Sequence, residues 1–453
     1  MFMKSKLLIF AAFAIASFFL GAPQSAQATL DLEVPLEMVD YGLQSQTSTT
    51  TFARTGMYLD ASDYDGATFY FEIVGETVAT DWSLVTLRDV TNGVDKVSIT
   101  PVPSQANVPK RWRSASWTPA SGKIEYRIKM GFTDITGDYI VHSARIVIEQ
   151  HNATKTRIQI PLVQRAFNAS AGVAGNVDTT TSTTYTQADP DRYSLWNKNT
   201  GVYADLCSIS CGGTPWTLEA VLSLATSSPP NDYAHAALFN STTGSQVTGT
   251  DISVMDTTEA TLADVSFSNA AANFTEGDNF DVKIKMTGSN TGAELRSAAR
   301  LYVKLENLRK AEILYRVGRV RGGTAGVAMP YQRVLLDKTK FSNPAIFFEA
   351  SGQCIQSTTH VSLRNHGTND SGTNGSNVTG SGLNFYVGSA TKVIERSGDI
   401  TANITSGNRF YAQTNSTSST LTLNHAWLVV QATEQIFHRW DGYLKFFGTL
   451  KFL

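Results

Sequence analysis

The chain of 453 residues carries 37 Lys and Arg against 39 Asp and Glu, a formal net charge of -2. Only 17% of its residues are charged, against roughly 25% in an average soluble protein. A near-neutral chain with so few basic residues does not fit nucleic-acid binding, which needs a basic surface to displace counterions. A hydrophobic content of 42% also excludes a chain that is disordered throughout.

The N-terminus has the pattern of a secretory signal peptide. Lys4 and Lys6 precede an apolar run from Leu7 to Leu20, and Ala26-Gln27-Ala28 supplies a small-x-small cleavage pattern. The apolar run is shorter than the roughly 20 residues that span a bilayer. We therefore predict that residues 1–28 are cleaved and that the protein is secreted, either extracellular or on the cell surface.

Four sequence blocks recur three times in the same order, which indicates three copies of one unit. In chain order within a unit, the blocks are Phe69–Glu72, Trp216–Glu219 and Ile346–Glu349; Val85–Arg88, Ala236–Phe239 and Val361–Arg364; Gly122–Met130, Gly277–Met286 and Gly407–Thr414; and Ser143–Glu149, Ala298–Lys304 and His425–Gln431.

Hydrophobic residues alternate with a period of two inside these blocks, as in half-buried antiparallel strands. We predict an all-β fold of three tandem antiparallel jelly-roll-like β-sandwiches, with units at 29–153, 154–308 and 309–433 and an aromatic C-terminal tail at 434–453. The short linkers predict units stacked end to end as a rod.

The blocks resemble the tandem jelly-roll modules of bacterial secreted and surface proteins, which are similar to carbohydrate-binding modules. The resemblance rests on the strand ending at Glu72, the Ser-Ala-Arg strand that begins at Ser143, and the Thr-rich stretch 180–185. It implies adhesion, glycan binding or a spacer role, and it does not imply catalysis.

The polar positions of these strands differ between units. Glu72 and Glu219 in the first two units predict cross-strand pairs with Arg145 and Arg300 on solvated sheet faces. In the third unit, aromatic and amide side chains replace the charges. Because sugar rings stack on aromatics and carboxylates or amides bond their hydroxyls, we hypothesise a glycan site there. Its residues are Phe347, Glu349, Tyr411, Gln413, Trp427 and Gln431. The alternative is that this face packs against a neighbouring unit or subunit.

One segment has the spacing of a weak calcium site. Asp60, Asp63 and Asp65 alternate before Gly66, and Glu72 falls where a calcium loop places its bidentate ligand. However, Glu72 also recurs in units that lack the aspartates, so a tight acidic turn is the preferred interpretation. No other cofactor is expected.

The chain has three cysteines. Cys207 and Cys211 are spaced to close a small disulfide loop, which leaves Cys354 as an odd thiol available for an intermolecular contact. Three inert thiols are the alternative.

No nucleophile elbow, zinc-protease or phosphate-loop motif occurs, so we predict no enzyme activity. The expected function is adhesion or glycan binding, with a glycan or cell-surface polymer as partner and no nucleic acid. Self-association could use Cys354 or the tail, which is either an amphipathic anchor or the opening of a fourth unit. The alternative function is a structural subunit or spacer of a cell envelope or appendage.

Overall fold

The computed structural model describes residues 28–44, 50–77, 83–100, 109–132, 139–164, 177–188, 196–197, 206–225, 231–255, 261–268, 274–275, 277–288, 292–306, 308, 310–323, 333–341, 343–354, 359–369, 375–386, 393–415 and 421–433. Most of the predicted signal peptide, residues 1–27, and the predicted tail, residues 434–453, lie outside the described residues. Ala28, the last residue of the predicted signal peptide, begins the first strand.

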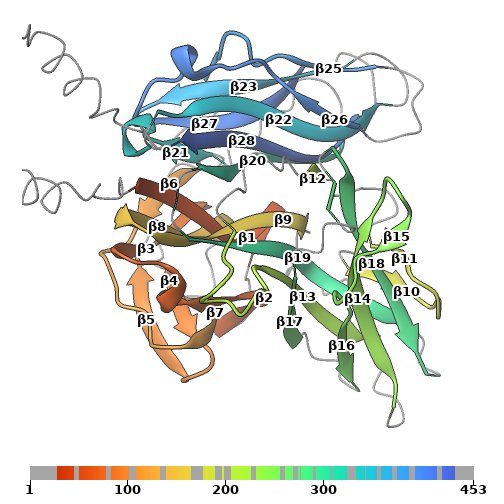
Figure 1. Cartoon of the computed structure of the whole chain (residues 1–453). Coiled ribbons are helices and arrows are strands. Elements are labelled where there is room, and N and C mark those ends of the chain that lie inside the picture. The colour runs from red at the N-terminus through yellow and green to blue at the C-terminus, as the bar shows by residue number, and fades with distance from the viewer. Residues whose placement is uncertain are drawn as a thin grey trace, which may run out of the picture.

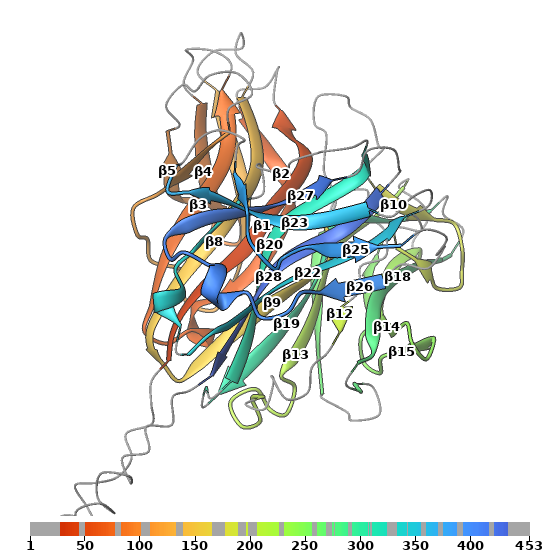
Figure 2. The same cartoon turned by 90° about the horizontal axis from the view of Figure 1, so that it is seen from above.

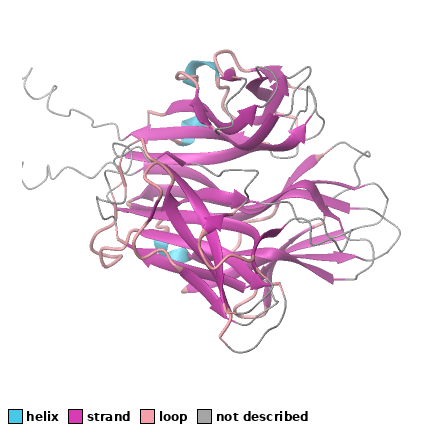
Figure 3. Ribbon diagram, turned by 90° about the vertical axis from the view of Figure 1, so that its right-hand side faces the viewer, coloured by secondary structure: helices cyan, strands magenta, loops and turns pink. Residues whose placement is uncertain are grey.

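The described chain is all-β, which confirms the predicted fold class. Its strands form six antiparallel sheets, and each sheet is built within one of three consecutive parts of the chain. We call these parts segment 1 (28–153), segment 2 (155–306) and segment 3 (310–433). Figure 3 shows the strands together with short helical turns, which are the 3-10 turns η1 (Ala61–Asp63), η5 (Lys338–Lys340) and η6 (Thr401–Asn403).

Segment 1 forms one sheet in the order β1-β8-β3-β6 and a second in the order β2-β7-β4-β5. Its strands are β1 (Ala28–Gln44), β2 (Thr50–Asp60), β3 (Ala67–Thr77), β4 (Ser83–Asp89), β5 (Val94–Ile99), β6 (Lys110–Arg113), β7 (Lys123–Phe132) and β8 (Tyr139–Ala153).

Segment 2 forms the sheet β10-β19-β13-β17, in which β9 also pairs with β19, and the sheet β11-β18-β14-β15, to which β12 and β16 are added. Its strands are β9 (Lys155–Gln164), β10 (Val177–Thr180), β11 (Thr186–Gln187), β12 (Trp196–Asn197), β13 (Trp216–Leu224), β14 (Tyr233–Asn240), β15 (Ser245–Gln246), β16 (Ile252–Met255), β17 (Thr261–Phe267), β18 (Asn279–Thr287) and β19 (Ala293–Glu306).

Segment 3 forms the sheets β20-β28-β22-β26 and β21-β27-β23-β24, with β25 added to β23. Its strands are β20 (Lys310–Gly323), β21 (Val334–Leu336), β22 (Ala345–Cys354), β23 (Thr359–Gly367), β24 (Ser376–Asn377), β25 (Leu383–Phe385), β26 (Val393–Arg396), β27 (Asn408–Asn415) and β28 (Leu421–Thr433).

The four repeated sequence blocks occupy matching places in the three segments. The block of Phe69 and the closing block of Ser143 pair as β3 and β8, and their counterparts pair as β13 with β19 and as β22 with β28. The other two blocks pair as β4 with β7, β14 with β18, and β23 with β27. We call the sheet that contains the closing block the inner sheet of a segment and the other its outer sheet.

Aromatic rings bridge the inner and outer sheets. In segment 2, Trp216 on β13 stacks on Phe274 with ring centroids 5.0 Å apart, and Phe274 contacts Phe280 on β18 at 5.1 Å. In segment 1, Trp117 contacts Phe69 on β3 at 5.7 Å and Tyr126 on β7 at 5.3 Å. These rings fill a core between two sheets, as a β-sandwich requires.

The segments form a triangle and not a rod, so the predicted end-to-end stacking is wrong. Segment 3 lies across both other segments, which sit side by side (Figure 1), and Figure 2 gives the same arrangement from above. The opening strands β1, β9 and β20 contact one another pairwise. Short linkers require consecutive units to be neighbours. They do not determine the angle between the units, which depends on the surfaces that pack together.

Replacement of Trp216 by alanine tests the sandwich core. Trp216 is fully buried, and loss of a buried Trp side chain costs about 3–5 kcal/mol because it leaves a cavity. Chemical denaturation should show this loss in W216A, whereas I209A, at a residue that is 90% exposed, should stay within about 0.5 kcal/mol of the parent. Equal stability of the two variants would contradict this core.

Candidate functional site

The polar faces of the inner sheets carry buried charged side chains. In segment 1, Glu72 lies directly across from Arg145, and in segment 2 Glu219 lies across from Arg300. The predicted cross-strand register is therefore present. However, all four side chains are at most 1% exposed, so the expectation of solvated faces is wrong.

The two arginines join neighbouring segments. Arg300 Nη1 donates to the carbonyl of Gly56 in segment 1 at 2.6 Å, and Arg145 Nη2 donates to the carbonyl of Arg333 in segment 3 at 2.8 Å. Gly56 and Arg333 hold matching places, because each precedes by four residues the aspartate, Asp60 or Asp337, that caps a 3-10 turn. One contact is thus used at two of the three segment interfaces.

The third interface replaces the arginine by aromatic rings. Trp427 on β28 stands where Arg145 and Arg300 stand, is completely buried, and stacks on His425 with ring centroids 4.9 Å apart. His425 Nε2 donates to the carbonyl of Leu162 in segment 2 at 2.9 Å. Segment 3 therefore contacts segment 2 through His425, whose ring is stacked on Trp427.

Ion pairs between segments 1 and 2 and between segments 3 and 1 use the same two positions with opposite charge. Asp63 at the end of η1 binds Lys304 on β19 at 2.7 Å, and Lys340 at the end of η5 binds Glu149 on β8 at 2.7 Å. Lys304 and Glu149 are matching residues of the closing block. Because exchanging the partners would bring like charges together, these pairs favour one arrangement of segments.

The predicted glycan residues do not form one exposed platform. Four of them lie on the inner sheet of segment 3, and two, Tyr411 and Gln413, lie on β27 of its outer sheet. Trp427 is 0% exposed and Tyr411 is 1% exposed, so neither ring can stack on a sugar from solution. The alternative of packing against a neighbouring unit fits Trp427, which is buried beside the contact of His425 with segment 2.

The other inner-sheet residues form an internal charge cluster. Arg396 Nε donates to Glu349 at 2.6 Å, and its guanidinium lies 5.4 Å from the centre of the half-buried ring of Phe347. Gln431 Nε2 donates to Glu312 at 2.9 Å. These side chains therefore bond to one another.

Tyr411 is covered from the loop side of its sheet. Its hydroxyl lies where a Cβ on Gly375 would come within 2.9 Å, and its ring lies 6.1 Å from the ring of His366. Burial raises the pKa of Tyr411, with an opposing effect of Arg364. Gln413 is half-buried and lies across from Ser362 on β23.

The aspartates of the predicted calcium loop have separate structural roles. Asp60 accepts from the Ser62 amide as a turn cap at 2.9 Å, while Asp63 binds Lys304 of segment 2. Asp65 accepts from the amides of Thr154 and Lys155. Within the described residues no group of three or more His, Cys, Asp or Glu side chains is placed to hold a metal. The tight acidic turn is the arrangement that the structure has.

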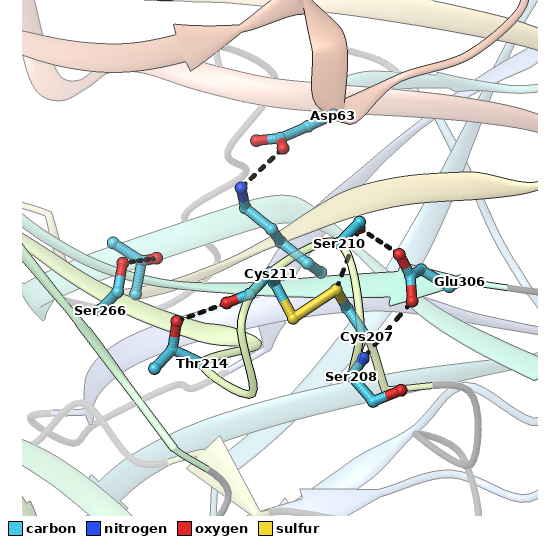
Figure 4. The surroundings of a disulfide bond; sticks show 10 residues. Asp63, Cys207, Ser208, Ser210, Cys211, Thr214, Ser266 and Glu306 are labelled. Carbon is cyan, nitrogen blue, oxygen red and sulfur yellow. Dashed lines mark hydrogen bonds and ion pairs between the residues drawn. A yellow bond between two sulfur atoms is a disulfide. The ribbon is translucent and has the colours of Figure 1, made fainter.

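Cys207 and Cys211 form a disulfide that closes a short loop before β13 (Figure 4). The loop is tied to the end of β19, since the Ser208 amide and the Ser210 hydroxyl both donate to Glu306. Cys354 is 1% exposed, with its sulfur 3.2 Å from the Thr359 hydroxyl. The predicted self-association through Cys354 is therefore wrong for the folded chain.

The matching buried glutamates titrate differently because they have different numbers of cations around them. Burial alone raises the pKa of Glu72, but Arg111, Arg145 and Arg113 outweigh burial and lower that pKa from 4.5 to about 2. At Glu349, burial raises the pKa and the carboxylate of Glu312 adds to the rise, against the single guanidinium of Arg396. Burial also raises the pKa of Glu219, with Arg300 opposing it.

Comparison with known proteins does not assign this arrangement to a family. No family model and no curated protein matches the chain. A tandem pair of CBM22 domains from Xyn10C of Paenibacillus barcinonensis is 9% identical, with a TM-score of 0.18, over 61% of this chain and 99% of that chain. A putative secreted protein from Parabacteroides distasonis is 7% identical, with a TM-score of 0.16, over 61% of this chain and 89% of that chain.

The structure of infectious bursal disease virus, Gx strain, covers 87% of this chain and 75% of its own, with 10% identity and a TM-score of 0.18. At these identities and scores, the similarities carry no conclusion about ligand or activity. Within the described residues there is also no helix with the length and apolar character needed to cross a membrane.

The pH dependence of stability tests the two glutamates. Because the pKa of Glu72 is lowered on folding, its contribution is present above about pH 4.5 and is lost as the pH falls toward 2. E72Q should lower the melting temperature at pH 7, since loss of one partner of a buried pair costs about 3–5 kcal/mol, and should approach the parent near pH 2. E349Q should cost less at pH 7, because its carboxylate is already disfavoured. Equal losses at pH 7 would contradict the cation count.

A charge reversal tests the contact between segments 1 and 2. The pair of Asp63 and Lys304 is partly exposed, so D63N should lower stability by only about 0.2–1 kcal/mol. D63K should cost more because it opposes two cations, Lys304 and Arg157, whose Nη1 lies 3.8 Å from Asp63. D63K/K304D should recover part of that loss. Thermal unfolding of the four proteins measures this, and no difference between D63K and D63N would argue against the pair.

Proposed function

We propose that the chain is an exported, non-enzymatic structural subunit of a cell envelope or surface appendage, built from three β-sandwich units fused into one rigid block. The observation that carries this proposal is the use of the inner-sheet polar faces. Arg145 and Arg300 donate hydrogen bonds to backbone carbonyls of a neighbouring segment. His425 does the same at the remaining interface.

This use of the inner faces favours a structural role over the expected glycan site. A string of binding modules keeps its recognition faces open, whereas here the ring of Trp427 is removed from solvent by packing. Three units around common contacts have the arrangement of a cyclic trimer made within one chain. A rigid block of this kind suits repeated contact with other copies, because little freedom is lost on assembly.

The extracellular location rests on the N-terminal sequence, where Lys4 and Lys6 precede the apolar run. The absence of enzyme activity rests on the lack of catalytic motifs in the sequence. The disulfide between Cys207 and Cys211 also suits an oxidising compartment.

Size-exclusion chromatography with light scattering tests the structural role. The mature chain, residues 29–453, should form species larger than a monomer that grow with protein concentration. C354S is the matched control, because it removes thiol cross-links that could form after partial unfolding and should assemble like the parent. A strict monomer over the whole concentration range would overturn this proposal.

A further inference from the structure

The outer sheet of segment 3 is directed away from the other two segments (Figure 1). Strand β25 runs along it, with Leu383 and Phe385 buried and Asn384 exposed. Tyr386 follows on the same side as Asn384 by strand alternation and is 68% exposed. Among the large hydrophobic side chains exposed in the described part of the chain, Tyr386 is the one aromatic.

The amide of Asn384 beside this ring is held in a fixed orientation. His360 on β23 lies across from Asn384, and its Nδ1 is hydrogen-bonded to Asn384 Oδ1. An amide oxygen only accepts, so His360 Nδ1 is the donor of this bond. The Nδ2 donors of Asn384 are then aimed away from this bond. The amide of Asn384 therefore stands about two residues, or roughly 7 Å, from the tyrosine along the strand direction.

A second amide on the same sheet is anchored in the same way. Asn377 Oδ1 accepts from the Ser362 hydroxyl at 3.1 Å and from the Arg364 guanidinium. Asn377 is exposed, so its Nδ2 group is available at the surface. The face therefore presents one oriented amide, Asn384, next to the ring and a second, Asn377, farther along the same strand direction.

Segment 1 has a carboxylate at one of the matching positions, whereas segment 2 has neutral residues at both. In segment 1, Asp95 stands where Asn377 stands and forms ion pairs with Arg88 at 2.8 Å and with Lys129 at 2.7 Å. In segment 2, His235 matches His360 and contacts Asp251 at 3.0 Å. However, the residue paired across from His235 is Ser253, and Gln246 stands in the place of Asn377. In segment 3 a neutral amide, Asn377, thus stands in the place of the carboxylate of Asp95.

We infer that this face of segment 3 binds a neutral polysaccharide, with Tyr386 as the stacking ring and Asn384 and Asn377 as hydroxyl-binding amides. Sugar rings present flat C–H faces to an aromatic ring and hydroxyls to fixed amides. Asn377 in place of a carboxylate removes one charge that would favour a charged partner. A protein partner would instead be expected to meet an apolar centre, whereas Asn384 and His360, the described residues placed next to Tyr386 on this face, are polar. This inference does not depend on the proposed assembly.

Affinity gel electrophoresis with xylan, hydroxyethylcellulose, glucomannan and galactomannan tests the inference on the mature chain. At least one of these gels should retard the parent protein. Y386A should reduce the retardation by at least about fivefold, since an aromatic contact of this kind is worth about 1 kcal/mol or more. Y386F should keep most of it, and N384A should weaken it.

I209A is the matched control, because it removes another highly exposed side chain far from this sheet in sequence and should migrate like the parent. Thermal melting of every variant shows that the fold is kept. Absence of retardation on all four gels would overturn the inference. Equal retardation of Y386A and the parent would also overturn it. So would binding only to a fifth gel, made with the charged polymer polygalacturonate, if salt abolished that binding. None of these results would bear on the assembly measured by light scattering.

Discussion

The structure depends on the pairing of buried carboxylates with arginines on inner sheets that are covered on both faces. Glu72 and Glu219 are completely buried, and burial of an unpaired carboxylate would be far too costly to tolerate. Each is matched across the strand by an arginine whose remaining donors reach a neighbouring segment. The same pairs therefore satisfy the inner sheet and fix the position of the next segment, so folding within a segment and packing between segments are not independent.

In segment 3 the matching buried carboxylate, Glu349, is neutralised by fewer cations. Trp427 takes the arginine position, and Glu349 turns to Arg396 on the edge strand β26. The cluster then holds two carboxylates, Glu349 and Glu312, for one guanidinium, which explains why the pKa of Glu349 is raised while that of Glu72 is lowered. Divergence among the repeats thus lies in electrostatics, with the strand pairing unchanged.

Repetition in the sequence was sufficient to predict the strands of the four repeated blocks, the pairing of Glu72 with Arg145 and of Glu219 with Arg300, and the all-β class, because each block alternates with a period of two. It could not predict which polar face meets solvent. The closing strands carry a signal that bears on this: Ile146 to Ile148 and Trp427 to Val430 are apolar at both parities, as expected for strands covered on both faces. Alternation also does not reveal which sheet a strand joins, so Tyr411 and Trp427 appeared to share a face although they lie on different sheets.

The ion pairs between segments, in which the charges at the two matching positions are reversed, determine which segments can pack against each other. In a homotrimer made of segment 1 alone, with the packing seen here, Asp63 of each copy would face Glu149 of the next, and two acids would meet at every interface. In the single chain Asp63 faces Lys304 and Glu149 faces Lys340. Each segment therefore needs the oppositely charged residues of its neighbours. Copies of one segment alone would bring like charges together at every interface.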